Sequence, residues 1–409
     1  MSITKLSDYE EIVGSQAIEE IRTLAQRVSH KRVKMINSTA LGGGVAEILT
    51  RLVPLLNESG VETNWDVIRG DENFFSVTKA FHNALHGKEV EINQKMFDTF
   101  IEYNKMNEKE INFEEDIIMV HDPQPVALID IKENTKARWI WRCHIDLSSP
   151  NMNVWNFLEN YVKRYDASVF SSPNFARKLS IPQFLISPSI DPLSEKNKEL
   201  SQDFIERVLE KYDITEDKPI ITQISRFDRL KDPLGVIEGY KLAKRYVDCQ
   251  LVLAGGGASD DPESIKFLPE IQERAKDDPD IHILNIPYFS DIEINALQRA
   301  STIIVQKSLK EGFGLTVTEA LWKKKPVIAS AVGGIPLQVR HNLTGMLVHS
   351  IDGLAYQIRY LLKNLHIMQK LGEYGHEYVK QKFIITRHLK DYLLLIIVLE
   401  HLDESIINI

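Results

Sequence analysis

The chain contains the apolar segment Thr302-Ile303-Ile304-Val305, followed shortly by Lys310-Glu311-Gly312-Phe313-Gly314-Leu315-Thr316-Val317-Thr318-Glu319-Ala320-Leu321-Trp322. This order predicts a strand, a short loop and the start of a helix. Gly312 and Gly314 allow a tight turn, and we expect Thr316 to cap the helix with Glu319 at its third position. Because a helix start presents unbonded N–H groups and the positive end of the helix dipole, the segment predicts a phosphate site.

Glu311 and Glu319 place two carboxylates in this segment, one in the loop and one in the helix. Their separation would let them reach different parts of one elongated ligand. From the local sequence alone, a capping residue and a solvated loop charge explain the two residues equally well.

Length and composition limit the class of protein. The chain has 409 residues, 43% hydrophobic and 26% charged, which predicts a globular protein of two domains. Its net charge of −9 without a basic run disfavours nucleic acid and membranes as partners. Cys143 and Cys249 lack paired or metal-ligand spacing, so we expect a cytoplasmic protein without a disulfide. Residues 1–11 are too polar for a signal peptide, and the apolar run 393–399 predicts a buried helix face.

Strands alternate with helix-length segments along the chain, which predicts an α/β fold with two doubly wound parallel sheets. An amphipathic helix is expected at 9–29, a long helical stretch at 74–107, and a connection between domains at 187–217. The final helices are expected at 351–364, 367–383 and 387–402. The expected strands are 33–37, 62–68, 117–120, 137–141, 167–170, 183–186, 219–224, 250–254, 281–284, 302–305, 326–329 and 345–348.

Polar residues follow three of the strands expected in the first half of the chain. Ligands of parallel sheets bind beyond the carboxyl ends of the strands, so these residues predict a binding site for a polyhydroxylated ligand. His82 is ambiguous, because it could simply line a helix. The candidates are Gly43, Gly44, His121, Asp122, Gln124, His144 and Asp146.

In the second half, Arg226 and Lys231 lie between a strand end and a helix start at Pro233. Two cations in that position could clamp a diphosphate, although the local sequence taken alone favours a solvated basic loop. Asp278-Pro279-Asp280 precedes a strand instead of following one, so we expect no metal site. Glycines at 255–257 and 333–334 predict a close approach of the backbone.

The spacing of Glu311 and Glu319 around Gly-Phe-Gly-Leu-Thr resembles the Glu-x7-Glu motif of retaining GT-B glycosyltransferases, and Arg226 and Lys231 are similar to their Arg-x4-Lys clamp. This resemblance implies two Rossmann-like domains facing each other across a cleft, with the N-terminal helix as an extension. It implies a first domain of residues 1–187 that binds the acceptor, a second of residues 188–384 that binds the nucleotide sugar, and a last helix, 385–409, that returns to the first.

The same resemblance implies roles for individual residues. Glu319 would hold the ribose of the donor, and Glu311 and His144 would contact the transferred hexose. Ser225 stands where the family has glycine before the clamp arginine, which puts the fit of the nucleotide in doubt. The implied catalytic residues are His144, Glu311, Arg226 and Lys231. The implied donor-binding residues are Arg226, Lys231, Gly312, Phe313, Gly314, Leu315, Thr316 and Glu319.

A narrower resemblance is carried by Asn37-Ser38-Thr39, Phe81-His82-Asn83-Ala84-Leu85, His121-Asp122-Pro123-Gln124 and Trp141-Arg142-Cys143-His144-Ile145-Asp146. These motifs are similar to the trehalose synthase (glycosyltransferring) subgroup. The resemblance implies transfer of glucose from UDP-, ADP- or GDP-glucose to glucose, with no cofactor and no metal. We also expect a homodimer, in which the N-terminal helix packs on its own domain or on the second subunit.

Three other functions are weighed against this one. A retaining trehalose phosphorylase has similar motifs but uses phosphate in place of a nucleotide. A two-lobed sensor that closes on a sugar or nucleotide sugar would need no diphosphate clamp beside Glu311 and Glu319, which disfavours it. A glycosidase needs two carboxylates flanking one bond, whereas the helix position of Glu319 places it on the nucleotide side.

Overall fold

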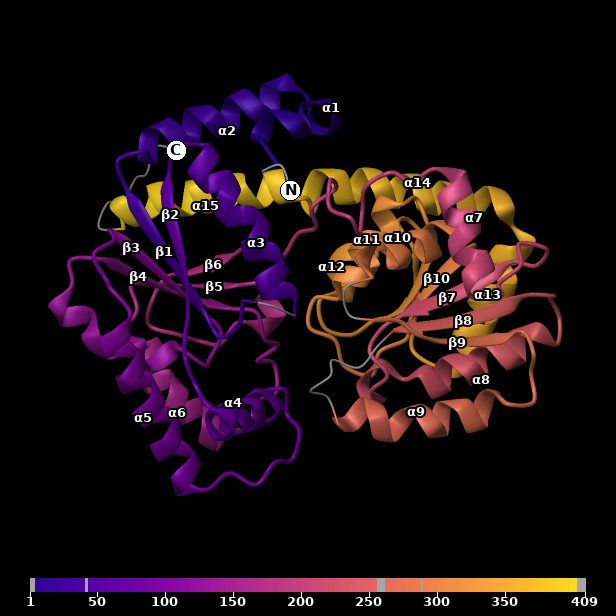
Figure 1. The fold of residues 1–409 in the computed structure, drawn as a ribbon, viewed down its shortest axis with the longest axis horizontal. Coiled ribbons are helices and arrows are strands. Elements are labelled where there is room, and N and C mark those ends of the chain that lie inside the picture. The colour runs from indigo at the N-terminus through magenta and orange to yellow at the C-terminus, as the bar shows by residue number, and fades with distance from the viewer. Residues whose placement is uncertain (1–3, 41–42, 256–261, 288–289, 403–409) are drawn as a thin grey trace. The chain divides into compact units, whose positions relative to one another are not determined.

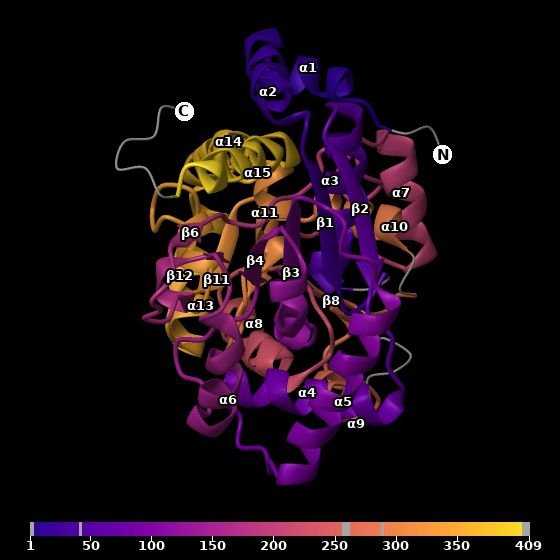
Figure 2. The ribbon, with the colours of Figure 1, turned by 90° about the vertical axis from the view of Figure 1, so that its left-hand side faces the viewer.

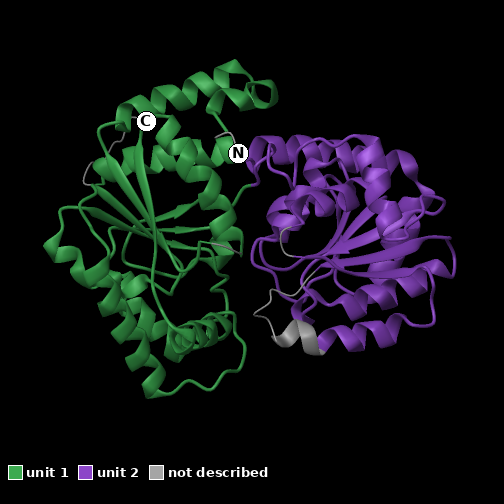
Figure 3. Ribbon diagram, in the orientation of Figure 1, with its two compact units in different colours: residues 1–189, 385–409 green, residues 190–384 purple. Residues whose placement is uncertain are grey.

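The computed structural model describes residues 4–40, 43–255, 262–287 and 290–402 (Figure 1). The chain divides into two compact units (Figure 3). The first comprises residues 1–189 and 385–409, and the second comprises residues 190–384. Each unit contains one parallel sheet of six strands with helices on both faces, so the predicted α/β class with two doubly wound sheets is confirmed.

The sheet of the first unit has the strand order β2-β1-β3-β4-β5-β6, and all its pairs are parallel. The chain runs from β1 outward to β2 and then crosses to β3 on the other side, so the order reverses between β1 and β3. Every residue of β3 is buried, as expected for a strand covered on both faces. The strands are β1 Arg32–Asn37, β2 Glu62–Val67, β3 Ile117–His121, β4 Arg138–Cys143, β5 Ala167–Phe170 and β6 Gln183–Leu185.

Helices cover both faces of this sheet (Figures 1 and 2). One face carries α2 Ser15–Val28, α3 Gly43–Glu58 and α15 Ile385–Glu400, and α15 packs against both α2 and α3. The other face carries α4 Glu72–Leu85, α5 Gln94–Glu110 and α6 Met152–Val162. The short elements are η1 Leu6–Tyr9, α1 Glu10–Val13, η2 Val126–Asn134 and η3 Pro173–Phe175.

Two helical segments predicted as continuous are divided. The stretch expected at 74–107 is two helices, α4 and α5, because Gly87 at φ +76° follows the first and Asn93 caps the second by accepting a hydrogen bond from Met96 N. The helix expected at 9–29 is likewise interrupted at Gly14, where φ is +85°. In both cases a glycine takes a left-handed conformation that ends the helix.

The sheet of the second unit has the order β12-β11-β10-β7-β8-β9, again with parallel pairs. Its order reverses between β7 and β10. The strands are β7 Ile220–Ile224, β8 Gln250–Gly255, β9 Ile281–Asn285, β10 Ile303–Gln306, β11 Val327–Ser330 and β12 Met346–Val348. The helices are α7 Gln202–Lys211, α8 Pro233–Lys244, α9 Pro262–Ala275, α10 Asp291–Ala300, α11 Leu315–Trp322, α12 Ile335–Gln338, α13 Ile351–Lys363 and α14 Leu365–Lys382, with the short η4 Arg229–Lys231.

The predicted connection at 187–217 was only partly right, because its second half is helix α7. Ser201 caps this helix by accepting a hydrogen bond from Phe204 N, and α7 packs on α10. Ile205, Val208 and Leu209 form its buried stripe. The segment therefore contributes to the core of the second unit. Its many charged residues made this contribution hard to recognise in the sequence.

The apolar run at 393–399 lies in α15 and is buried, as predicted: Leu393 and Leu399 are both fully buried. Arg387, near the start of α15, donates hydrogen bonds to the carbonyls of Ser187 and Pro188 at 2.8 and 3.0 Å. Among the described residues, no helix is long and apolar enough to span a membrane.

We expect Leu393→Ala to lower the free energy of unfolding by about 2–5 kcal/mol, because it opens a cavity where a fully buried side chain stood. Leu365→Ala is the control, since the Leu365 side chain is 63% exposed, and it should cost no more than about 0.5 kcal/mol. Chemical denaturation monitored by fluorescence measures both. Equal losses would mean that α15 does not contribute to the core.

Candidate functional site

The reversal between β7 and β10 brings Lys231 and Glu311 together. Nζ of Lys231 lies 2.7 and 2.8 Å from the two carboxylate oxygens of Glu311, and both side chains are largely buried. Ser308 Oγ also donates to this carboxylate at 2.9 Å, and Gln306 Nε2 donates to it at 3.3 Å. A lysine and a glutamate 80 residues apart thus form one charged group at the carboxyl edge of the sheet.

Arg226 lies in the loop that leads to Lys231, with its side chain 58% exposed. Its guanidinium is 3.3 Å from the carboxylate of Asp228. Asp228 also accepts hydrogen bonds from the N–H groups of Leu230 and Lys231, at 2.9 and 3.1 Å, and so fixes the short helix η4. The two predicted clamp cations therefore differ: Lys231 is held in place, whereas Arg226 extends toward solvent.

The predicted cap of helix α11 was wrong. The N-cap is Gly314 at φ +81°, and no side chain in the described part of the chain caps the helix. Thr316 is the second helical residue and Glu319 the fifth, so they cannot form a capping box. The left-handed turn at glycine, which a threonine would adopt only with strain, makes the entry to the helix instead. Gly312, Phe313 and Leu315 complete the loop and the first turn of α11.

Glu319 is buried and is surrounded by groups that the sequence did not reveal. Gln298 Nε2 donates to its carboxylate at 3.3 Å, and Lys196 Nζ lies 3.9 Å away. Lys323, one turn further along α11, donates to Asn197 Oδ1 at 2.9 Å. Burial lowers the pKa of Lys323 to about 7, and Glu319 opposes this only in part. Lys323 follows Glu319 at the helical spacing of four residues, whereas no sequence spacing relates Glu319 to Gln298 or Lys196, which come from α10 and from the segment before α7.

Gly333 and Gly334 hold the loop around Glu311. A Cβ on Gly333 would lie 1.8 Å from the carbonyl oxygen of Glu311, and Gly334 N donates to the carbonyl of Gly312 at 2.7 Å. Gly255 is equally restricted, because its Cβ would lie 1.8 Å from the carbonyl oxygen of Ser225. The predicted close approach of the backbone is confirmed at these positions, while Gly256 and Gly257 lie outside the described residues.

In the first unit, His121, Asp122 and His144 meet where β3 and β4 end. Nδ1 of His121 is 3.0 Å from Nε2 of His144, and Asp122 Oδ1 accepts a hydrogen bond from His144 N at 2.7 Å. Asp122 has φ +66°, a strained backbone that aspartate tolerates better than most residues. Burial raises the pKa of Asp122 to about 6, opposed by the N–H of His144 and by the Arg142 guanidinium.

The guanidinium of Arg142 lies behind this group and was not predicted from the sequence. Its side chain is fully buried and donates to the carbonyl of Ile186 at 2.7 Å. Burial and, second, the charge of Arg142 together lower the pKa of His121 to about 3. Burial, Arg142, His121 and His388 lower the pKa of His144 well below its usual range. Both rings are therefore neutral at neutral pH.

The remaining candidates of the first unit have surroundings of their own. Asp146 accepts a hydrogen bond from Ser148 N at 2.8 Å, and the side-chain oxygen of Gln124 is buried without a hydrogen-bond partner among the described residues. Gly43, at φ +81°, is the first residue of α3, the helix that follows β1, and Gly44 is the second. His82 lies on α4 with its ring 4.7 Å from that of His86.

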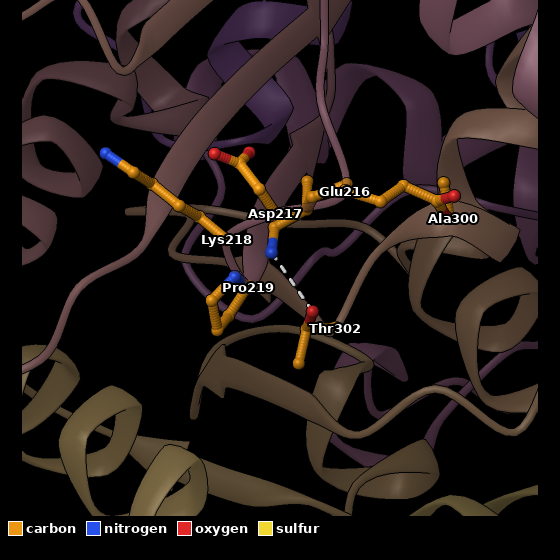
Figure 4. A pocket seen from close by; sticks show the side chains of 7 residues that line it. Glu216, Asp217, Lys218, Pro219, Ala300 and Thr302 are labelled. Carbon is orange, nitrogen blue, oxygen red and sulfur yellow. Dashed lines mark hydrogen bonds between the residues drawn. The ribbon is translucent and has the colours of Figure 1, made fainter.

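A cavity of about 300 Å³ lies at the opposite end of the second sheet (Figure 4). Its walls are residues 216–220 before and at the start of β7, together with Ala300 and Thr302 before β10. Thr302 Oγ1 accepts a hydrogen bond from Ile220 N at 3.0 Å. Because ligands of parallel sheets bind at the carboxyl ends of the strands, this cavity is not the candidate site.

Within the described residues, no group of three His, Cys, Asp or Glu side chains is arranged to hold a metal ion. Asp278 and Asp280 have other partners. Lys244 Nζ lies 2.5 Å from Asp278 and 2.6 Å from Asp280, and Lys218 lies 3.0 Å from Asp280. These carboxylates thus hold the loop before β9.

The chain matches two family models and several known proteins. Residues 35–177 match the trehalose synthase N-terminal domain, and residues 204–378 match glycosyl transferases group 1. The trehalose synthase of Thermococcus litoralis is 44% identical over 395 residues, covering 95% of this chain and 96% of the relative. The trehalose phosphorylase of Pleurotus pulmonarius is 28% identical over 438 residues, covering 93% of this chain and 59% of the relative.

The fold is similar to the crystal structure of an α,α-trehalose-phosphate synthase (UDP-forming) from Burkholderia xenovorans in complex with glucose-6-phosphate. The TM-score is 0.73 at 13% identity, covering 90% of this chain and 100% of that chain. Two Rossmann-like sheets and the group 1 match define the class of protein, a glycosyltransferase of GT-B fold. Within that class, the chain belongs to the trehalose synthase family. The resemblance inferred from the sequence motifs is confirmed.

We expect Gly333→Ala to destabilise the protein by roughly 1–3 kcal/mol or more, because the new methyl group overlaps the carbonyl of Glu311 and φ is +55°. Gly312→Ala is the matched control in the same loop, since a Cβ there meets nothing within 4 Å, and it should cost about 1 kcal/mol or less. Thermal unfolding compares the two variants. Similar Tm values would show that the loop is not held as described.

Asp122 should make stability depend on pH. Its pKa is higher in the folded protein than in the unfolded chain, so the folded state binds more protons between about pH 4 and pH 6, and stability falls as pH rises through this range. Asp122→Asn keeps the oxygen that accepts from His144 N but carries no charge. We expect this variant to be more stable than wild type at about pH 7.5, by up to about 2 kcal/mol, and to lose the advantage near pH 4.

Unfolding measured at both pH values checks this expectation. A variant that is less stable than wild type at about pH 7.5 would contradict a raised pKa of Asp122. A stabilising substitution that also abolishes activity would mark Asp122 as a residue kept for function at a cost in stability.

Proposed function

We propose that this protein transfers glucose from a nucleoside diphosphate glucose to free glucose and forms trehalose with retention of anomeric configuration. The observation that carries the proposal is the Lys231–Glu311 pair at the reversal between β7 and β10, followed by the uncapped N-terminus of α11. A cation, a carboxylate and a helix start at one point of the sheet suit a ligand that joins a phosphate to a sugar.

On this proposal the second unit binds the donor. The N–H groups at the start of α11 and the side chains of Lys231 and Arg226 bind the diphosphate, and Glu319 binds the ribose hydroxyls. Negative charge grows on the leaving diphosphate as the bond to the sugar breaks, so fixed cations stabilise the transition state more than the ground state. Lys231 is already fixed by Glu311, whereas the exposed Arg226 supplies a second charge.

Glu311 would hold hydroxyl groups of the transferred hexose. Its carboxylate accepts hydrogen bonds from three side chains, those of Lys231, Ser308 and Gln306. These partners orient the carboxylate, which favours a role in binding. A general acid would need a raised pKa and a less polar environment. The proton of the acceptor would therefore pass to the leaving phosphate.

The first unit would bind the acceptor and part of the hexose through Asp122, His144, Gln124, Asp146 and the start of α3, with the buried His121 bonded to His144 behind them. Asp122 supports this role, because its buried carboxylate and strained backbone are unfavourable for stability. Such features concentrate at functional sites. The cytoplasmic location and the homodimer expected from the sequence stay predictions, and gel filtration of the full chain would test the dimer.

A phosphorylase is the alternative, supported by the match to the Pleurotus pulmonarius enzyme, of which this chain spans 59%. The experiment incubates the protein with UDP-, ADP- or GDP-glucose and glucose, then measures free nucleotide and non-reducing disaccharide. A second arm supplies trehalose and phosphate. Nucleotide release with trehalose formation supports the synthase, reaction only with phosphate supports the phosphorylase, and ligand binding without either reaction indicates a sensor.

We expect Arg226→Ala to lower kcat by about 100-fold while changing the donor KM by less than about tenfold, because its charge acts mainly on the transition state. Arg229→Ala is the control, since Arg229 lies in the same loop but is paired with Glu270 at 2.8 Å. It should keep kcat within about twofold. Steady-state kinetics decide, and wild-type turnover in Arg226→Ala would rule out its role in the clamp.

Glu319→Gln should mainly weaken donor binding. The amide removes the charge that ribose hydroxyls bind but keeps the size of the side chain, so we expect the donor Kd to rise by about tenfold or more. Calorimetric titration with the nucleoside diphosphate measures the change. An unchanged Kd in a folded Glu319→Gln variant would place the ribose elsewhere.

A further inference from the structure

The two histidines of the first unit share a single hydrogen. Nδ1 of His121 and Nε2 of His144 are 3.0 Å apart, and the ring planes differ by only 15°. A hydrogen bond between two imidazoles lies in the planes of the rings, so nearly parallel rings suit it. The hydrogen belongs either to His121 or to His144, and the choice decides what His144 can offer to a ligand.

The second nitrogen of His121 settles the choice. Nε2 of His121 lies 3.5 Å from the sulfur of Met35, and the His121 side chain is only 1% exposed. A thioether can accept a hydrogen bond weakly but has no hydrogen to donate. Nε2 of His121 must therefore carry the hydrogen if it is to be bonded at all. A neutral ring has only one N–H group, which leaves Nδ1 of His121 as an acceptor.

The groups around the pair keep both rings neutral. The guanidinium of Arg142 comes from β4, and His388 comes from α15, where its Nδ1 lies 2.8 Å from Ser189 Oγ. Asp122 contacts the pair, and its carboxylate accepts a hydrogen bond from the backbone N–H of His144. Burial and the Arg142 charge both disfavour an imidazolium, and they lower the pKa of His121 to about 3.

We propose that His121 is a positioning residue that holds His144 as the Nε2–H tautomer, so that Nδ1 of His144 accepts a hydrogen bond from a hydroxyl group of the hexose. The tautomer rests on geometry alone, while the hexose rests on the proposed function. His144 is partly exposed, and its Nδ1 has no hydrogen-bond partner among the described residues. A ring nitrogen without a hydrogen can accept from a hydroxyl group and orient it, but it cannot donate to a phosphate oxygen. The negative charge on the leaving diphosphate would therefore be stabilised by Arg226 and Lys231.

The tautomer can be measured in the free, full-length protein without any substrate. Nitrogen NMR on protein labelled with ¹⁵N-histidine distinguishes protonated from bare ring nitrogens, with signals assigned from His121→Asn and His144→Gln. We expect protonated Nε2 and bare Nδ1 on His144, unchanged from about pH 5.5 to pH 8.5. A hydrogen on Nδ1, or a doubly protonated ring at neutral pH, overturns the proposal whatever the enzyme's activity.

A pair of variants tests the role of His121. His121→Asn places a carbonyl oxygen where Nδ1 stands and can still accept from His144, whereas His121→Leu cannot. We expect His121→Leu to release the tautomer and to lower kcat/KM about 10- to 100-fold further than His121→Asn does, because only the asparagine can still accept the hydrogen bond from His144. If both folded variants lose activity equally and keep the wild-type tautomer, His121 serves only packing and the proposal fails.

The two tests separate this proposal from the proposed function. If the tautomer is found as expected but neither nucleotide release nor phosphorolysis is observed, the assignment of the histidines stands and the proposed reaction fails. If trehalose forms but His144 carries its hydrogen on Nδ1, the reaction stands and the positioning role of His121 is wrong.

Discussion

The direction of the strands is the constraint on which the structure depends. In a parallel sheet every strand ends at the same edge, and where the strand order reverses, the loops after two neighbouring strands diverge and leave their side chains exposed to a ligand. This happens between β7 and β10, where Lys231 meets Glu311, and between β1 and β3, where His121 ends β3 and Asp122 follows it. Each of the two candidate groups of polar residues thus lies at the reversal of strand order in its own sheet.

Each group depends on support from segments distant in sequence. Arg142 and the start of α15 lie behind the histidines, while the segment before α7 places Lys196 and Asn197 beside α11. Burying such groups is unfavourable unless they are paired, and the pairing here is incomplete: two nitrogens of Arg142 lack hydrogen-bond partners among the described residues. The first unit therefore keeps, beside His144 and Asp122, polar groups that a purely structural core would exclude.

The fold could be predicted because its signal is local and repeated. The bounds of the twelve predicted strands agree with those of the structure to within about two residues. A strand that is buried on both faces has a continuous apolar sequence, which makes it easy to recognise. The errors also have local causes. Thr316 was expected to cap α11, but Gly314 makes a left-handed turn that no threonine would favour. The break between α4 and α5 was missed although Gly87 lies between them, and the charged segment around α7 concealed a buried stripe.

The sequence by itself determined the two sheets, the residues at the carboxyl ends of their strands, and the family, because periodicity, strand ends and motif spacing are properties of neighbouring residues. The tertiary structure decided which of those residues touch: that Lys231 is bound by Glu311, that His121 bonds His144, and that Lys196 and Gln298 lie beside Glu319. It also decided their charges. Burial and the fixed charge of Arg142 set the pKa of Asp122 and of the histidines, and both depend on segments that only folding brings together.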